Sequence, residues 1–159
     1  MNIFFDESVI LLDLEADTAE EVLTVMANHL VDKGLVKDSF VHAMIEREAQ
    51  FATGLPTEGI SVAIPHTDIE HVNQKTISVA VLKEPVDFGV MGEAEAKTPV
   101  KLVFMLAMDQ AHSQLSILQR LMQVFQDKET LHYLTHEKNK TQIKNVLAEK
   151  LKIALKGGE

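Results

Sequence analysis

The residue of this sequence best suited to chemistry is His66, which directly follows an apolar run and a proline. Residues 60–64 are mostly apolar and partly β-branched, which predicts a strand, and Pro65 is incompatible with a helix at that point. A side chain in this position is held by a rigid strand end while it faces solvent. Imidazole keeps a free nitrogen lone pair near neutral pH, so we expect His66 to act as a nucleophile.

Two further polar residues are placed to join His66. His112 follows an expected strand at 100–107 across a short loop and immediately precedes a predicted helix, and Arg47 lies near the end of an earlier helix. If the strands at 60–64 and 100–107 are parallel neighbours, both histidines emerge at one sheet edge, where open α/β sheets place their ligand sites. Two imidazoles and a guanidinium suit an anionic tetrahedral group such as phosphoryl.

Other interpretations of these side chains stay open. His112 could belong to a helix cap, and Arg47 could be a helix-end cation that satisfies carbonyl groups. A metal-dependent hydrolase built on His66, Asp68 and His71 is another possibility, but the two histidines are five positions apart, which fits no standard zinc spacing on one segment. We therefore expect neither a metal nor a cofactor.

The order of periodic patterns predicts one layered α/β domain over residues 1–159, with its core at about 5–150. Thr18 and Glu21 have the spacing of a capping box, and Gly34 is a stop signal for the helix that begins there. A central sheet with helices before and after it in the sequence implies helices on both faces of that sheet. The predicted strands are 9–14, 60–64, 76–82 and 100–107, and loops separate the last three of them. The predicted helices are 18–33, 38–51, 113–125, 128–135 and 141–155.

Composition excludes several classes of function. The net charge of −9, without clustered lysine or arginine, disfavours nucleic acid as a ligand. The absence of cysteine excludes disulfides and thiolate chemistry on this chain. The acidic N-terminal stretch is unlike a secretory signal, and no apolar run approaches the roughly 20 residues that span a bilayer. We therefore expect a cytoplasmic protein that would act at a membrane only through a partner.

Three segments resemble the IIA components of the bacterial phosphoenolpyruvate-dependent sugar phosphotransferase system, fructose-mannitol class. They are residues 46–55, residues 64–68, and the region from Leu106 that includes His112, and the resemblance extends over residues 5–150. Residues 53–55, the Pro-His-Thr-Asp run with His71-Val72, and residues 85–88 resemble the galactitol-type IIA proteins most closely. The sequence departs from other subgroups at Thr67, where they commonly carry glycine.

The resemblance implies a specific function. The histidine that matches His66 accepts a phosphoryl group from the phosphohistidine of the carrier protein HPr and passes it to a cysteine of the IIB component, which serves the membrane component IIC. The residues that match Arg47 and His112 neutralise and position the phosphoryl oxygens, and either the backbone or the hydroxyl of Thr67 could add a contact. The family fold is a mixed sheet with helices on both faces.

Two roles of such a phosphohistidine remain open. One is transport, in which the phosphoryl group moves on to IIB for uptake of a sugar or sugar alcohol, galactitol-type by the resemblance. The other is a regulatory module that controls a transcription factor or a transporter. In either case the second substrate is a protein side chain, so we expect an apolar docking surface with a charged rim around His66 in place of a deep pocket.

Overall fold

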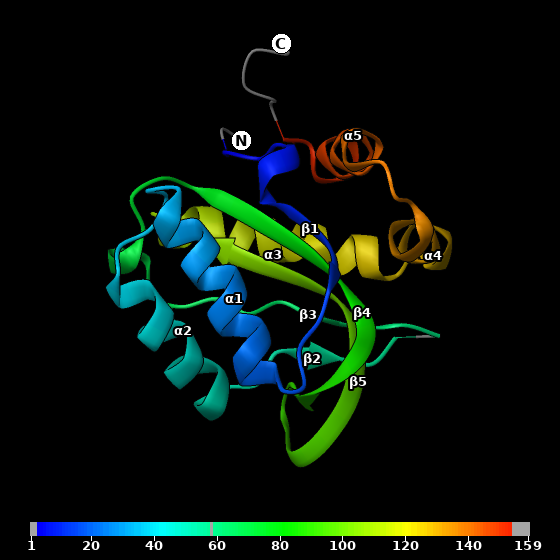
Figure 1. Ribbon diagram of the computed structural model, residues 1–159, viewed down its shortest axis with the longest axis horizontal. Helices are drawn as coiled ribbons and strands as arrows, with labels where there is room; N and C mark the ends of the chain where they lie inside the picture. Colours follow the sequence, from blue (N-terminus) through cyan, green and yellow to red (C-terminus); the bar gives the residue numbers. More distant parts are fainter. Residues whose placement is uncertain (1–2, 58, 154–159) are drawn as a thin grey trace.

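The computed structural model describes residues 3–57 and 59–153, and its longest elements are two antiparallel strands, β4 (Thr76–Val90) and β5 (Glu93–Ala107). β1 (Ile10–Leu14) runs parallel to β4, and β3 (Ser61–Ala63) runs parallel to β5. β2 (Gly54–Leu55) is antiparallel to β3 and also bridges to the end of β4. These pairings build the mixed five-stranded sheet seen in Figure 1.

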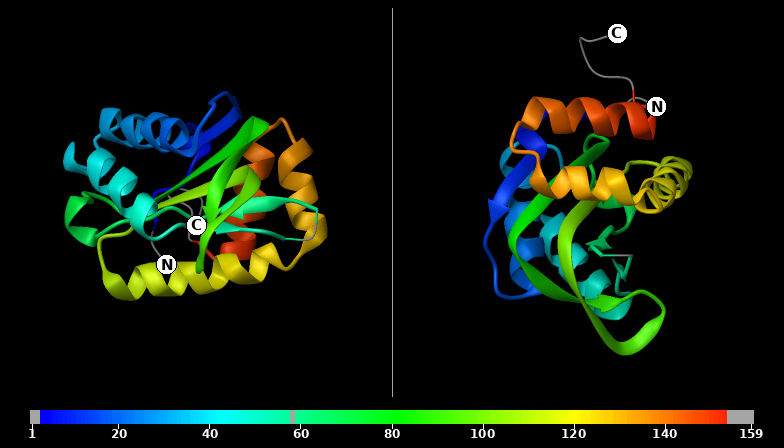
Figure 2. Two further views of the ribbon diagram at one scale, coloured as in Figure 1. Left: turned by 90° about the horizontal axis from the view of Figure 1, so that it is seen from below. Right: turned by 90° about the vertical axis from the view of Figure 1, so that its right-hand side faces the viewer.

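Helices cover both faces of the sheet, which confirms the predicted fold class. α1 (Ala19–Asp32) and α2 (Ser39–Gln50) lie on one face, and α3 (Ala111–Phe125) lies on the other (Figure 2). α4 (Lys128–His136) and α5 (Lys140–Leu151) pack against α3. Two short 3-10 turns, η1 (Glu7–Val9) and η2 (Ile69–His71), precede β1 and β4.

The helix boundaries follow from local side-chain chemistry. The side chain of Thr18 accepts the backbone N–H of Glu21 at 3.1 Å, as the capping signal predicts. Gly34 adopts a φ of 74° just after α1, a conformation that costs glycine least. Among the helices of the described residues, none is long and apolar enough to cross a membrane.

The predicted loop at 83–99 is wrong, because β4 and β5 continue through it as a hairpin that turns at Met91 and Gly92. The arms of this hairpin are partly exposed and polar, so they lack the apolar character of the inner strand segments. A register shift between Val81 and Val86 accommodates Pro85, which cannot donate to a strand ladder. Pairing between the arms, which the local sequence does not reveal, makes the hairpin.

Three smaller boundaries also differ from the prediction. β2 was not predicted, because two residues are too few to show a periodic pattern. α3 begins at Ala111, so His112 lies inside its first turn and does not precede it. α5 ends at Leu151, where Lys152 turns to a φ of 56°, and not at 155; residues 154 and 155 are outside the described residues.

A close backbone approach at Gly54 joins β2 to the hairpin. A Cβ atom at residue 54 would lie 2.4 Å from the carbonyl oxygen of Gly89, which is backbone and cannot turn aside. Only glycine therefore allows β2 to reach β4 while it stays paired with β3.

We predict that Gly54→Ala destabilises the fold by about 2–3 kcal/mol, because the added methyl group forces β2 away from β4. Gly34→Ala is the matched control: it adds the same atom in open space at a positive φ, and should cost about 1 kcal/mol. Denaturant unfolding of the two variants measures both effects. Equal losses of stability would contradict the steric argument.

Candidate active site

His66 lies at the edge of the sheet, just beyond the end of β3. The amide of Leu106 in β5 donates to the carbonyl of Pro65 at 3.0 Å, and His66 forms an isolated parallel bridge with Leu106. The parallel neighbourhood of the two strands, on which the predicted site depends, is therefore confirmed. The backbone of His66 is held by sheet pairing while its side chain stays partly exposed.

One ring nitrogen of His66 is already engaged. Nδ1 lies 2.8 Å from the carbonyl oxygen of Ile64. A carbonyl can only accept a hydrogen bond, so Nδ1 must carry the proton and Nε2 keeps the lone pair in the neutral ring. The fold thus selects one tautomer and leaves the free lone pair on Nε2.

The surroundings of His66 also favour its neutral form. Burial lowers the pKa of His66 below its ordinary value, the hydrogen bond to Ile64 raises it in part, and the positive charge of Arg47 lowers it further. At neutral pH the ring is therefore uncharged and able to attack an electrophile.

Arg47 lies in the last turn of α2, where its charge acts on His66. Its guanidinium carbon is 4.4 Å from the centroid of the Phe51 ring, a cation–π distance. Stacking on one face leaves the N–H groups at the edge of the guanidinium free to bind an oxyanion. Arg47 is thus close enough for its positive charge to lower the pKa of His66.

His112 is exposed on the first turn of α3, six residues after the Leu106 that pairs with His66. The two histidines thus belong to adjoining backbone segments at the same end of β5. Within the described residues, His112 forms no hydrogen bond or ion pair, so its imidazole is available to a ligand.

Thr67 is turned away from solvent. Its side chain is 7% exposed, and its hydroxyl lies 3.4 Å from the carbonyl of Ala43 in α2. The hydroxyl is thereby directed toward α2, which favours a backbone contact over a hydroxyl contact if residue 67 binds a ligand.

The segment after His66 and the start of α3 enclose a shallow hollow. Two of its apolar side chains are unusually exposed for their size, Ile69 at 37% and Leu115 at 58%. Acidic side chains line the same hollow, so apolar and charged groups lie together in it. Its lining residues are Asp68, Ile69, Glu70, Ala111, Gln114, Leu115 and Leu118.

The residues of the alternative metal site are not assembled. Nδ1 of His71 lies 2.8 Å from the hydroxyl of Ser39 in α2. In residues 3–57 and 59–153, no three histidine, cysteine, aspartate or glutamate side chains are grouped so that they could hold a metal ion.

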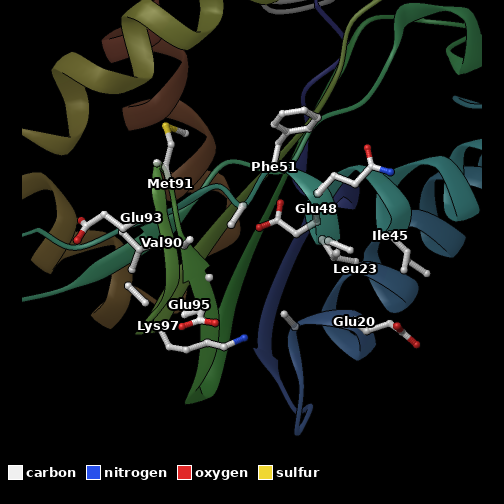
Figure 3. Close-up of a pocket in the computed structure, with 18 residues that line it drawn as sticks. Glu20, Leu23, Ile45, Glu48, Phe51, Val90, Met91, Glu93, Glu95 and Lys97 are labelled. Carbon is white, nitrogen blue, oxygen red and sulfur yellow. The ribbon is translucent and has the colours of Figure 1, made fainter.

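Glu48, the neighbour of Arg47, was not among the site residues predicted from the sequence. Its side chain is only 9% exposed, and it accepts two hydrogen bonds from Thr53, one from the backbone N–H and one from the hydroxyl, both at 2.8 Å. Figure 3 shows Glu48 on the α2 side of a groove whose other wall is the tip of the β4–β5 hairpin. A sequence signal existed: Phe40, Met44 and Glu48 form a four-residue repeat on the buried face of α2.

Burial raises the pKa of Glu48 to about 7, although both hydrogen bonds from Thr53 lower it in part. The folded state therefore binds the proton more tightly than the unfolded chain, whose glutamate titrates near 4.5. Between these two pH values the native protein holds more protons than the unfolded one, so stability falls as the pH rises.

We predict that Glu48→Gln leaves stability almost unchanged at pH 4.5 and raises it relative to the parent by up to about 3 kcal/mol at pH 8. The amide can bind Thr53 as the protonated acid does, but it never ionises. Chemical denaturation across this pH range gives the measurement, with the exposed Glu46→Gln as control. If the free energy of unfolding of Glu48→Gln differed from that of the parent by the same amount at every pH, Glu48 would not titrate within the fold.

The chain matches a family model and resembles known proteins of the same family. Residues 3–150 match the family model described as phosphoenolpyruvate-dependent sugar phosphotransferase system, EIIA 2. The galactitol-specific EIIA component of Escherichia coli strain K12 is 34% identical over 101 residues, which are 64% of this chain and 67% of that protein.

The fold of this chain is also similar to those of solved structures. The IIA mannitol protein of Escherichia coli has a TM-score of 0.71 at 26% identity, covering 92% of this chain and 98% of that one. The enzyme IIA of the mannitol system in complex with phosphorylated enzyme IIB, also from Escherichia coli, has a TM-score of 0.72 at 24% identity, covering 96% and 99%.

Proposed function

Because the chain belongs to the EIIA type 2 family of the sugar phosphotransferase system, whose members are phosphotransferases, we propose that Nε2 of His66 is its phosphoryl acceptor. The observation that supports this most directly is the bond from Nδ1 to the Ile64 carbonyl, which leaves Nε2 as the nucleophile. We further propose phospho-HPr as donor, a cysteine of a IIB component as acceptor, and a galactitol-type sugar alcohol as the transported substrate.

The first transfer requires an in-line approach of the donor phosphohistidine to His66. As the bond from Nε2 to phosphorus forms, the bond from phosphorus to the donor nitrogen breaks and the donor ring leaves with the electron pair. The His66 ring then bears a positive charge with Nδ1 still protonated, and the Ile64 carbonyl stabilises that charge. In the second transfer a thiolate attacks phosphorus and Nε2 departs with its lone pair restored.

Arg47 and His112 are proposed to bind the phosphoryl oxygens. A guanidinium presents paired N–H donors that match two oxygens of a phosphoryl group, and an imidazole can donate to a third. The charge of Arg47 already acts at the His66 ring in the free protein. This preorganised charge lowers the cost of the transition state, in which negative charge is spread over the equatorial oxygens.

We predict that incubation with phosphoenolpyruvate, the first enzyme of the system and HPr adds one acid-labile, base-stable phosphoryl group to His66. His66→Ala should abolish the adduct, while the matched variant His71→Ala should keep it. Mass analysis of the intact protein and its peptides measures this, and an adduct on any other residue would refute the site.

Transfer of that phosphoryl group to a cysteine of a IIB protein distinguishes transport from regulation. A chase of phosphorylated protein with candidate IIB proteins should move the label to IIB within the mixing time. Retention of the label, with binding to a transcription factor or transporter, would support the regulatory role in its place.

The hollow beside His66 is the proposed docking surface for both protein partners. Its apolar side chains Ile69 and Leu115 are exposed in the free protein and would be covered in the complexes. A small apolar area next to acidic side chains suits a transient contact with each partner.

We predict that Leu115→Asp raises the KM for phospho-HPr by roughly tenfold or more, because it puts a charge into an apolar contact. Val25→Asp is the control, since Val25 is 47% exposed on α1, on the opposite face of the sheet from α3. Initial rates of phosphorylation at several donor concentrations give KM and kcat for both. An unchanged KM in Leu115→Asp would place the docking surface elsewhere.

A further inference from the structure

Burial of the Glu48 carboxyl group destabilises the fold, which indicates that this residue serves a purpose other than stability. Its side chain is nine-tenths buried, and within the described residues it has no ion-pair partner. Burial of an unneutralised carboxylate opposes folding, so an apolar side chain on this face of α2 would be the more stable choice. The same face otherwise carries Phe40 and Met44.

Glu48 holds Thr53 through two hydrogen bonds, which together we call the clamp. Oε2 accepts the backbone N–H and Oε1 accepts the hydroxyl, so both oxygens hold one residue in one orientation. Thr53 is 4% exposed and directly precedes β2. The clamp therefore fixes how the chain leaves α2 and enters the sheet.

From Thr53 the hydrogen bonds continue to the His66 ring. The carbonyl of Thr53 accepts the N–H of Ile64 at 3.4 Å, which extends the antiparallel pairing of β2 with β3 by one rung. Ile64, 2% exposed, then offers its own carbonyl to Nδ1 of His66 at 2.8 Å. Glu48, Thr53, Ile64 and His66 thus form one continuous path.

The same clamp also closes the turn that follows Arg47, the cation of the proposed site. Arg47 precedes Glu48, and Phe51, which stacks on Arg47, lies between Glu48 and Thr53. The N–H of Phe51 donates to the carbonyl of Arg47 at 2.7 Å, which ends α2. Movement of Thr53 away from Glu48 would release both this turn and the Ile64 strand end.

We infer that Glu48 is a positioning residue for phosphoryl transfer: through Thr53 and Ile64 it holds His66 in the Nδ1–H tautomer, and it fixes the end of α2 that carries Arg47. This inference rests on His66 as the proposed phosphoryl acceptor. Glu48 does not touch the phosphoryl group, and it acts only through the main chain of its neighbours.

The test compares Glu48→Leu, which removes both acceptors, with Glu48→Gln, which can keep the clamp. The amide oxygen of glutamine can accept the Thr53 N–H, and its NH₂ group can donate to the Thr53 hydroxyl after that hydroxyl rotates. We expect Glu48→Leu to lower kcat for phosphoryl acceptance by roughly 10- to 100-fold at unchanged KM, and Glu48→Gln to restore the parent rate.

Nitrogen NMR of labelled histidine reads the tautomer of His66 without any phosphorylation. The parent and Glu48→Gln should show a protonated Nδ1, whereas Glu48→Leu should show a mixture of both tautomers. The control Glu46→Leu, on the exposed side of α2, should change neither the tautomer nor the rate. If Glu48→Leu does not fold, Thr53→Val, which loses only the hydroxyl bond, should show a smaller shift in the same direction.

A folded Glu48→Leu protein with one tautomer and the parent kcat would overturn the inference. Failure of the parent to become phosphorylated on His66 would instead reject the proposed function, while the tautomer measurement would still decide whether Glu48 orients the ring. The two failures are therefore distinguishable.

Discussion

The hydrogen bond between Nδ1 of His66 and the carbonyl of Ile64 is the interaction on which the proposed chemistry of this protein depends. A free imidazole exchanges its proton between two nitrogens, and only one of them can face a partner protein. The bond removes this choice, because the carbonyl accepts but cannot donate. Pairing of Pro65 with Leu106 then holds the ring at the sheet edge.

Electrostatics of the site differ between the resting and the proposed loaded states. In the resting state, burial and Arg47 keep the pKa of His66 low, so the ring is neutral. In the loaded state the ring would be cationic and the phosphoryl oxygens anionic, and the same arginine would then lie next to opposite charge. One fixed cation thus favours both the nucleophile before transfer and the adduct after it.

The sequence was sufficient for the parts of the fold that local chemistry determines. The apolar run and Pro65 predicted a strand end at His66, and Thr18 predicted the start of α1. The parallel pairing of residues 60–64 with 100–107 was a condition of the predicted site, and the structure confirms it. The shared sheet edge of His66 and of the segment that leads to His112 was predictable for this reason.

What could not be predicted depends on contacts between distant segments. The arms of the hairpin carry polar residues and proline, so they resemble a loop until their mutual pairing is known. Glu48 resembles an ordinary solvated helix residue by its type, and only its four-residue spacing from Phe40 and Met44 indicates that it lies on the buried face of α2. β2 forms by pairing with β3 and β4, and its two residues show no strand pattern of their own.

The group that orients the His66 ring belongs to the main chain. Where a side-chain carboxylate performs this task in other enzymes, one nucleotide change can remove it. Every amino acid supplies a carbonyl, so substitutions of Ile64 preserve the acceptor as long as the backbone keeps its course. Surface residues around the ring can therefore diverge to suit new protein partners while the orientation of the imidazole is inherited unchanged.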